Sequence, residues 1–160
     1  MSELRIDVAD LLAHPGARRD VTVSAEIDAL RGTAAVIEGP VGVRASLERI
    51  SHGIVVRGEV TARWAAQCSA CLRALEQNLT VHVDELFEPS PVEGETYPLE
   101  GHELDLEQLV RDAVLLELPL APHCDPPCGP DAAGGASRPE DGDPDEATDP
   151  RWAPLAELEL

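Results

Sequence analysis

Lysine is absent from this chain of 160 residues, and all twelve basic residues are arginine. The chain therefore has no Walker A loop, because that motif places a lysine against the nucleotide phosphates. A Gly-x-Ser-x-Gly nucleophile elbow is also missing. The five histidines lie in separate segments, with no His-x-x-x-His pair to build a hydrolytic zinc site. These absences argue against an enzyme.

Aromatic residues make up only 2% of the chain, so a core must be built from valine, leucine, isoleucine and alanine. The length and the 43% hydrophobic content suit a single moderate core with tails. No apolar run approaches the roughly 18 residues of a membrane span, and the N-terminus has no secretory-signal pattern. We therefore expect a cytoplasmic protein in a reducing compartment, where persistent disulfides are rare.

The formal net charge of the whole chain is −19, and basic residues are scarce in its second half. Residues 1–83 hold nine arginines against ten acidic residues, whereas residues 84–160 hold three arginines against twenty-one acidic residues. A surface this negative is repelled by phosphate backbones, which argues against extensive nucleic-acid binding. Only the N-terminal half could present a basic patch.

Alternating apolar and polar residues predict strands through the first half of the chain. The expected strands cover residues 21–28, 41–50, 54–67 and 75–84. The last two form a long antiparallel ribbon that reverses at Cys68 and Cys71. We expect this tip to lack support from neighbouring strands, so that it would gain most from a metal clamp.

One main helix is predicted to start at Asp105, whose side chain can cap free N–H groups while Gln108 stands in the capping-box position. Pro119 and Pro122 would end it. Its apolar positions keep helical spacing, at Leu106, Leu109, Val110, Ala113 and Leu116. The fold class is therefore α+β, with an antiparallel bent sheet or partial β-barrel from about residue 3 to 87 and one main packed helix.

The C-terminal third predicts a change of organisation. Residues 1–128 would form a single α+β domain, and residues 129–149 read as a flexible acidic linker poor in apolar side chains. Residues 150–160 would form a short C-terminal helix or docking segment. Trp152 and Leu155 are its candidate docking residues, either onto the domain itself or onto a partner.

The chain has only four cysteines, in the pairs Cys68-x-x-Cys71 and Cys124-x-x-x-Cys128. Two close-set pairs can supply the four ligands of a tetrahedral zinc ion, in a closed and therefore structural site. Inert thiols and redox catalysis by the first pair are the alternatives, but a redox pair normally opens a helix rather than a hairpin tip. His123 is a spare ligand candidate.

Three stretches taken in order resemble the YceD family of bacterial large ribosomal RNA subunit accumulation proteins. They are residues 68–72 with the strand ending at 84–87, residues 105–112 running to 118–122, and residues 149–155. The resemblance implies a non-enzymatic factor for synthesis, processing or stability of large-subunit 23S rRNA. Many relatives carry a further Cys-x-x-Cys knuckle after the position of Cys128, where this chain has none. Either the four cysteines suffice for zinc, or the metal has been lost.

The charge distribution suits a basic large-subunit ribosomal protein as the partner, with an rRNA precursor at the arginine-bearing side. The candidates for direct RNA contact are Arg57, Arg63 and Arg73. The alternative is that Arg57 and Arg63 pair with acidic residues on a solvated sheet face. A second functional hypothesis is a zinc-stabilised protein-interaction adaptor unrelated to the ribosome. We expect no membrane and no small-molecule substrate.

Overall fold

The computed structural model describes residues 3–128. The predicted linker at 129–149 and the predicted docking segment at 150–160, with Trp152 and Leu155, lie outside the described residues. The helices are α1 (Ala9–Ala13) and α2 (Glu107–Glu117). The strands are β1 (Arg5–Asp7), β2 (Arg18–Ala25), β3 (Ala35–Ile37), β4 (Val41–Arg49), β5 (Ile54–Gln67), β6 (Ala74–Glu88), β7 (Tyr97–Glu100) and β8 (Glu103–Asp105).

The strands form one bent sheet, a half-barrel in the order β1-β8-β7-β6-β5-β4-β2, with β3 also paired to β5. The sheet is mixed, so the prediction of an antiparallel sheet is wrong. The named strands of the described residues pair antiparallel except β6 and β7, in which Phe87 and Tyr97 are parallel partners. The chain leaves β6, loops back through residues 89–96 and runs again in the same direction. This return is stabilised by stacking of the two rings, whose centroids lie 5.1 Å apart.

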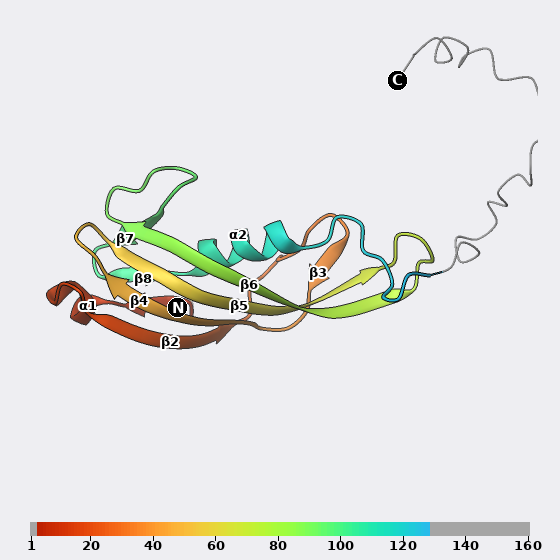
Figure 1. Ribbon diagram of the computed structural model, residues 1–160, viewed down its shortest axis with the longest axis horizontal. Helices are drawn as coiled ribbons and strands as arrows, with labels where there is room; N and C mark the ends of the chain where they lie inside the picture. Colours follow the sequence, from red (N-terminus) through yellow and green to blue (C-terminus); the bar gives the residue numbers. More distant parts are fainter. Residues whose placement is uncertain (1–2, 129–160) are drawn as a thin grey trace, which may run out of the picture.

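The ribbon of β5 and β6 is the longest feature of the fold and extends to one end of the molecule (Figure 1). Val56, Val60 and Trp64 alternate toward the core and are buried. β4 pairs with β5 as far as Thr61, and β3 continues along the same edge as far as Ala66. Neighbouring strands therefore support β5 almost to its end, and the turn that carries Cys68 and Cys71 projects beyond them, as expected for the tip.

α2 begins two residues later than predicted, and Asp105 belongs to β8 instead. Its carboxylate nevertheless accepts a hydrogen bond from the Glu107 N–H at 2.9 Å, so it satisfies one of the free donors of the first turn. The predicted capping box does not form, because Gln108 donates to the carboxylate of Asp112 instead. The helix ends before Leu118, which takes an extended conformation ahead of Pro119.

The core lies between the concave face of the sheet and α2, which runs along β5 and β6 (Figure 1). α2 contributes Leu109, Val110 and Val114 to it. Phe87 is the largest fully buried side chain. The architecture is thus α+β in the broad sense, with the sheet dominant and two helices among the described residues. Within residues 3–128, neither helix has the length and apolar content needed to cross a membrane.

Candidate metal centre

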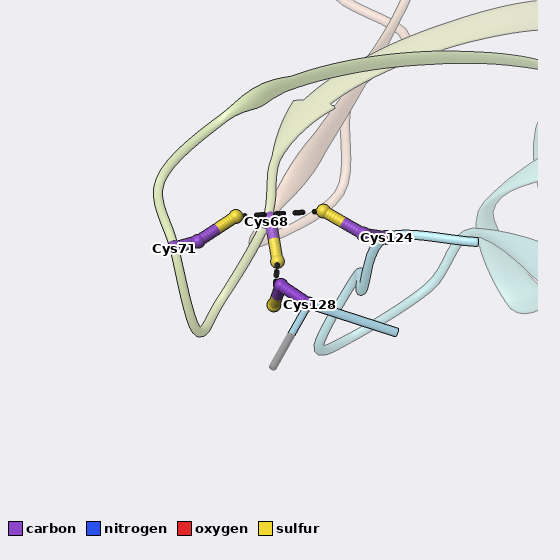
Figure 2. Close-up of side chains that lie close together, drawn as sticks. All are labelled: Cys68, Cys71, Cys124 and Cys128. Carbon is purple, nitrogen blue, oxygen red and sulfur yellow. Dashed lines mark hydrogen bonds between the residues drawn. The ribbon is translucent and has the colours of Figure 1, made fainter. Parts of the chain in front are cut away.

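The four cysteines meet at the end of the β5–β6 ribbon (Figure 2). Their sulfur atoms all lie within 4.8 Å of one another. Cys68 Sγ is 3.7 Å from Cys128 Sγ, and Cys71 Sγ is 3.4 Å from Cys124 Sγ. Four sulfurs each about 2.3 Å from one zinc ion form a tetrahedron with edges of about 3.8 Å. The observed separations approach that edge and far exceed a disulfide bond of about 2.05 Å, so the four are free thiols.

Two segments distant in the sequence build this cluster. Cys68 and Cys71 come from the turn between β5 and β6, while Cys124 and Cys128 come from the segment that follows α2 and runs beside the ribbon to its tip (Figure 1). The Ser69 N–H donates to the Pro122 carbonyl at 2.7 Å, which joins the two loops by a backbone hydrogen bond. The extended exit from α2 therefore aims the second cysteine pair at the first.

The turn at the ribbon tip is held by its own backbone. The Cys68 N–H donates to the Arg73 carbonyl at 2.8 Å, and the Leu72 N–H donates to the Cys68 carbonyl at 2.9 Å. Leu72 has φ of 60°, in the left-handed region that usually requires glycine or asparagine. Its side chain is 69% exposed. The backbone thus accepts a strained residue to fold the turn around the sulfur of Cys68, which is fully buried.

Hydrogen bonding divides the charge unevenly among the sulfurs. The backbone N–H groups of Cys71 and Ala70 point at Cys68 and lower the pKa of its thiol to about 5. A hydrogen bond to Cys71, and to a lesser extent one to Cys68, raises the pKa of Cys124 to about 12. A hydrogen bond to Cys68 raises the pKa of Cys128. The four thiols therefore share protons, because four thiolates this close would repel one another. A divalent cation would remove that repulsion.

The donor set fits a structural zinc ion. All four ligands are soft sulfur atoms, and a tetrahedral ion held by four of them has no coordination position left for water or substrate. His123, the spare ligand in the sequence prediction, is exposed and stands outside the four-sulfur group. The described residues thus bring together the four predicted metal ligands without the histidine.

The three arginines predicted to contact RNA differ in their surroundings. Arg57 Nε lies 3.0 Å from the Asp84 carboxylate, and its Nη1 lies 3.6 Å from Glu48. Arg63 Nη2 lies 2.8 Å from Glu76 and 3.7 Å from Glu38. Both are therefore neutralised by acidic residues of neighbouring strands and connections. Arg73 is exposed at the ribbon tip and forms no ion pair within residues 3–128.

An acidic groove between α2 and the β6–β7 edge was missed by the sequence reading. It contains a cavity of about 650 Å³ beside the 91–96 loop and an adjoining cavity of about 270 Å³ against β6. Helical spacing had placed Leu116 among the packed positions, but its side chain is 86% exposed here. The high density of acidic residues after position 83 was the available signal, but it could not say where those residues would gather.

The comparisons with known proteins agree with the sequence resemblance. A family model described as "Large ribosomal RNA subunit accumulation protein YceD" matches residues 56–159. Uncharacterised proteins of Mycobacterium bovis and Mycobacterium tuberculosis are 32% identical over 170 residues, covering 98% of this chain and 82% of theirs. One from Mycobacterium leprae is 35% identical over 129 residues, covering 74% of this chain and 59% of its own. No solved structure matches the chain.

Proposed function

This chain belongs to the YceD family of large ribosomal RNA subunit accumulation proteins, and from that membership we propose that it is a non-enzymatic factor of ribosome biogenesis. It supports the synthesis, processing or stability of large-subunit 23S rRNA in the bacterial cytoplasm. The observation that carries the proposal is the family match, which spans almost the whole β5–β6 ribbon, α2 and all four cysteines.

The four cysteines would hold zinc as a structural cross-link. Cys68 and Cys71 anchor it to the ribbon, and Cys124 and Cys128 anchor it to the segment after α2. When bound, the ion supplies a rigid connection and no reaction chemistry, because four sulfur ligands close its coordination sphere. The protein residues would thereby fix the direction in which the chain leaves the domain at residue 128.

The surface charges of the chain suit a basic protein as the partner better than bare RNA. Arg57 and Arg63 are already paired with carboxylates, so a phosphate would have to compete with those groups. Arg73 is the remaining candidate for a phosphate contact. The groove beside α2 is acidic and attracts lysine and arginine side chains. We therefore place the main contact with the ribosome on a basic large-subunit ribosomal protein, with rRNA at the ribbon tip.

Sedimentation tests this proposal. The full chain carrying an epitope tag is expressed in growing cells, and lysates are separated on sucrose gradients at low salt. We expect the chain to migrate with precursors of the large subunit and not with those of the small subunit, which serve as the internal control. Depletion should lower the ratio of 23S to 16S rRNA. A chain that stays at the top of the gradient would contradict the proposal.

A second candidate is a zinc-stabilised adaptor whose partners lie outside the ribosome. The closed sulfur site and the acidic groove favour it, since both are features of a binding scaffold and neither requires rRNA. The two candidates separate in the same experiment. The adaptor predicts an unchanged ratio of 23S to 16S rRNA after depletion and no comigration with precursor particles.

A further inference from the structure

The groove beside α2 is lined by residues of β6, the 91–96 loop, the start of β7 and α2. Its two cavities share four residues, so they form one continuous depression. These four are Glu85 from β6, Tyr97 from β7, and Asp112 and Leu116 from α2. The groove lies on the concave side of the sheet, since Glu85 alternates in register with the buried Val83 and Phe87.

Apolar side chains are accessible along this groove. Leu116 is 86% exposed, and Val81 and Ala113 are only partly buried beside the core. Leu115 and Leu120, at and beyond the end of α2, are also exposed, the latter by 82%. Large apolar side chains gathered at one helix end and next to a depression are typical of a surface that is covered in a complex. The groove therefore offers an anchoring position for an apolar side chain.

The charge of the groove is uniformly negative apart from a histidine. The carboxylates of the lining are Glu85, Glu93, Glu95, Asp112 and Glu117, and no arginine lines either cavity. Asp112 accepts hydrogen bonds from the Tyr97 hydroxyl at 3.0 Å and from Gln108 Nε2 at 2.8 Å. Both donors are neutral, so they fix the carboxylate in place without cancelling its charge. Burial, Asp84 and Asp112 together raise the pKa of Glu85.

This arrangement contrasts with the outer face of the sheet. There Asp84 and Glu76 face Arg57 and Arg63, so their charges are largely cancelled. None of the five groove carboxylates forms an ion pair with an arginine within residues 3–128. The groove thus gathers five carboxylates whose negative charge is left for a partner to neutralise.

We propose that the groove binds a segment of another protein in which lysine or arginine side chains flank an apolar anchor residue. The anchor packs on Leu116, and the basic residues face Asp112 and the glutamates of the 91–96 loop. This inference deepens the proposed function, because it rests on a basic protein as the partner and names the surface that holds it. Charge complementarity selects this occupant over the others.

Three other occupants are disfavoured by charge. The chain's own residues 129–160 carry nine acidic residues against two arginines, so the groove repels most of that segment. RNA carries the same sign as the groove. A second copy docked groove to groove would bring together two sets of like charges, which costs association free energy.

The test uses the zinc-loaded full chain and a fluorescein-labelled synthetic peptide with leucine and lysine at helical spacing. Fluorescence anisotropy measures its dissociation constant, and an acidic peptide of the same apolar pattern is the probe control. We expect the basic peptide alone to bind. Leu116→Ser and the double variant Glu93→Gln/Glu95→Gln should each weaken binding about tenfold, as central interface residues do.

Two matched variants outside the groove control for loss of apolar surface and of charge. Leu72→Ser removes an exposed leucine at the ribbon tip, and Glu38→Gln/Glu76→Gln removes the two exposed carboxylates that pair with Arg63 and line neither groove cavity. Both should change the dissociation constant by less than about twofold. Equal weakening by groove and control variants, or no binding of the basic peptide, would overturn the proposal. All altered side chains are exposed, and circular dichroism checks that each variant is folded.

The other occupants give different results. Tighter peptide binding after Trp152→Ala would show that the chain's own tail fills the groove. A dimer that Leu116→Ser dissociates would show a second copy, and a single-stranded RNA released by the same change would show RNA. Each result overturns the proposal. The inference and the proposed function can fail separately. If the chain comigrates with large-subunit precursors, Leu116→Ser leaves that comigration intact and no peptide binds, the inference fails and the proposed function stands.

Discussion

Cys71 Sγ lies 3.4 Å from Cys124 Sγ, across a sequence separation of 53 residues. Together with Cys68 and Cys128 these thiols form a four-sulfur cluster, which predicts one zinc ion per chain when the protein is purified without chelator. Changing Cys71 and Cys124 together to serine should abolish stoichiometric zinc, because two ligands from different loops are lost. Native mass spectrometry measures the metal content. A double variant that keeps one zinc ion per chain would contradict the site.

Removal of zinc should open the ribbon tip without unfolding the domain. Cys68 and Cys124 are buried, yet neither belongs to the hydrophobic core cluster that joins the sheet to α2. β3 pairs with β5 as far as Ala66, so the strands remain supported up to the turn. A chelator at neutral pH should therefore speed amide exchange at Ser69 and Leu72, while the amide of Val60 stays protected.

Hydrogen exchange read by mass spectrometry or NMR checks this. A chelator that abolishes the far-ultraviolet dichroism of the whole chain would show that the metal is required for the entire fold. The tip should open in the same local way at acidic pH, since zinc binding requires the sulfurs to be deprotonated.

Leu72→Gly should stabilise the zinc-loaded protein, although it removes a large side chain. Leu72 holds φ of 60° with 69% of its surface exposed, so the change relieves backbone strain and forfeits little burial. A residue with a side chain costs roughly 1 kcal/mol in this region relative to glycine. We expect a gain of that order in the free energy of unfolding, offset in part by the greater freedom of glycine in the unfolded chain.

Ala29 is the matched control for this substitution. It also has positive φ, at 57°, but lies far from the cysteines in the sequence. Both glycine variants should gain stability in urea titrations, whereas only Leu72→Gly should slow zinc loss to a competing chelator. A loss of stability in Leu72→Gly would mean that its exposed side chain makes a contact that the strain argument ignores.

The local structure of the ribbon could be predicted from sequence because it depends on short-range patterns. Alternation from Ile54 to Gln67 gives the bounds of β5 as observed, and the reversal at the first cysteine pair is confirmed. The meeting of the two cysteine pairs is confirmed as well. Thiol spacing predicted it, since two short loops must each aim two sulfurs at one point to hold a metal.

The features that sequence could not predict depend on long-range packing. β7 and β8 are only four and three residues long, too short to show a period, and β1 pairs with β8 rather than with β2. The parallel pairing of β6 with β7 places Phe87 against Tyr97, and a contact between two isolated aromatic residues leaves no repeating pattern in the sequence. Helical spacing likewise predicted that Leu116 is packed, whereas its side chain is 86% exposed, because the spacing alone cannot show which positions of a helix the sheet covers.

Gly58→Ala should destabilise the fold, because β4 and β5 approach each other closely there. A Cβ at Gly58 would collide with the carbonyl oxygen of Arg44 and crowd Ala45 on the paired strand. Overpacking of this kind costs about 1–3 kcal/mol. Gly32→Ala is the control, since its Cβ would meet the flexible side chain of Leu118 at 3.4 Å. Thermal unfolding of the two variants checks the difference, and equal melting temperatures would contradict the close approach.

Glu85→Gln should make the protein more stable at neutral pH and less able to bind a basic peptide. Burial raises the pKa of Glu85 first, and the charges of Asp84 and Asp112 raise it further. The folded protein therefore binds a proton at this site more tightly than the unfolded chain, whose glutamates titrate near pH 4.3. Protonation of Glu85 therefore increases the free energy of unfolding as the pH falls through the raised pKa, and this contribution is lost as the pH rises through it.

Glutamine mimics the protonated form, so the gain from Glu85→Gln should be full at pH 7 and shrink as the pH approaches the unfolded value. Urea titrations at several pH values measure this, with Glu59→Gln on the outer face as the control. A gain in the free energy of unfolding that does not vary with pH would contradict an electrostatic origin of the effect. Because the carboxylate is costly to the fold and faces the groove, its removal should weaken peptide binding while it stabilises the domain, which is expected of a residue kept for a partner.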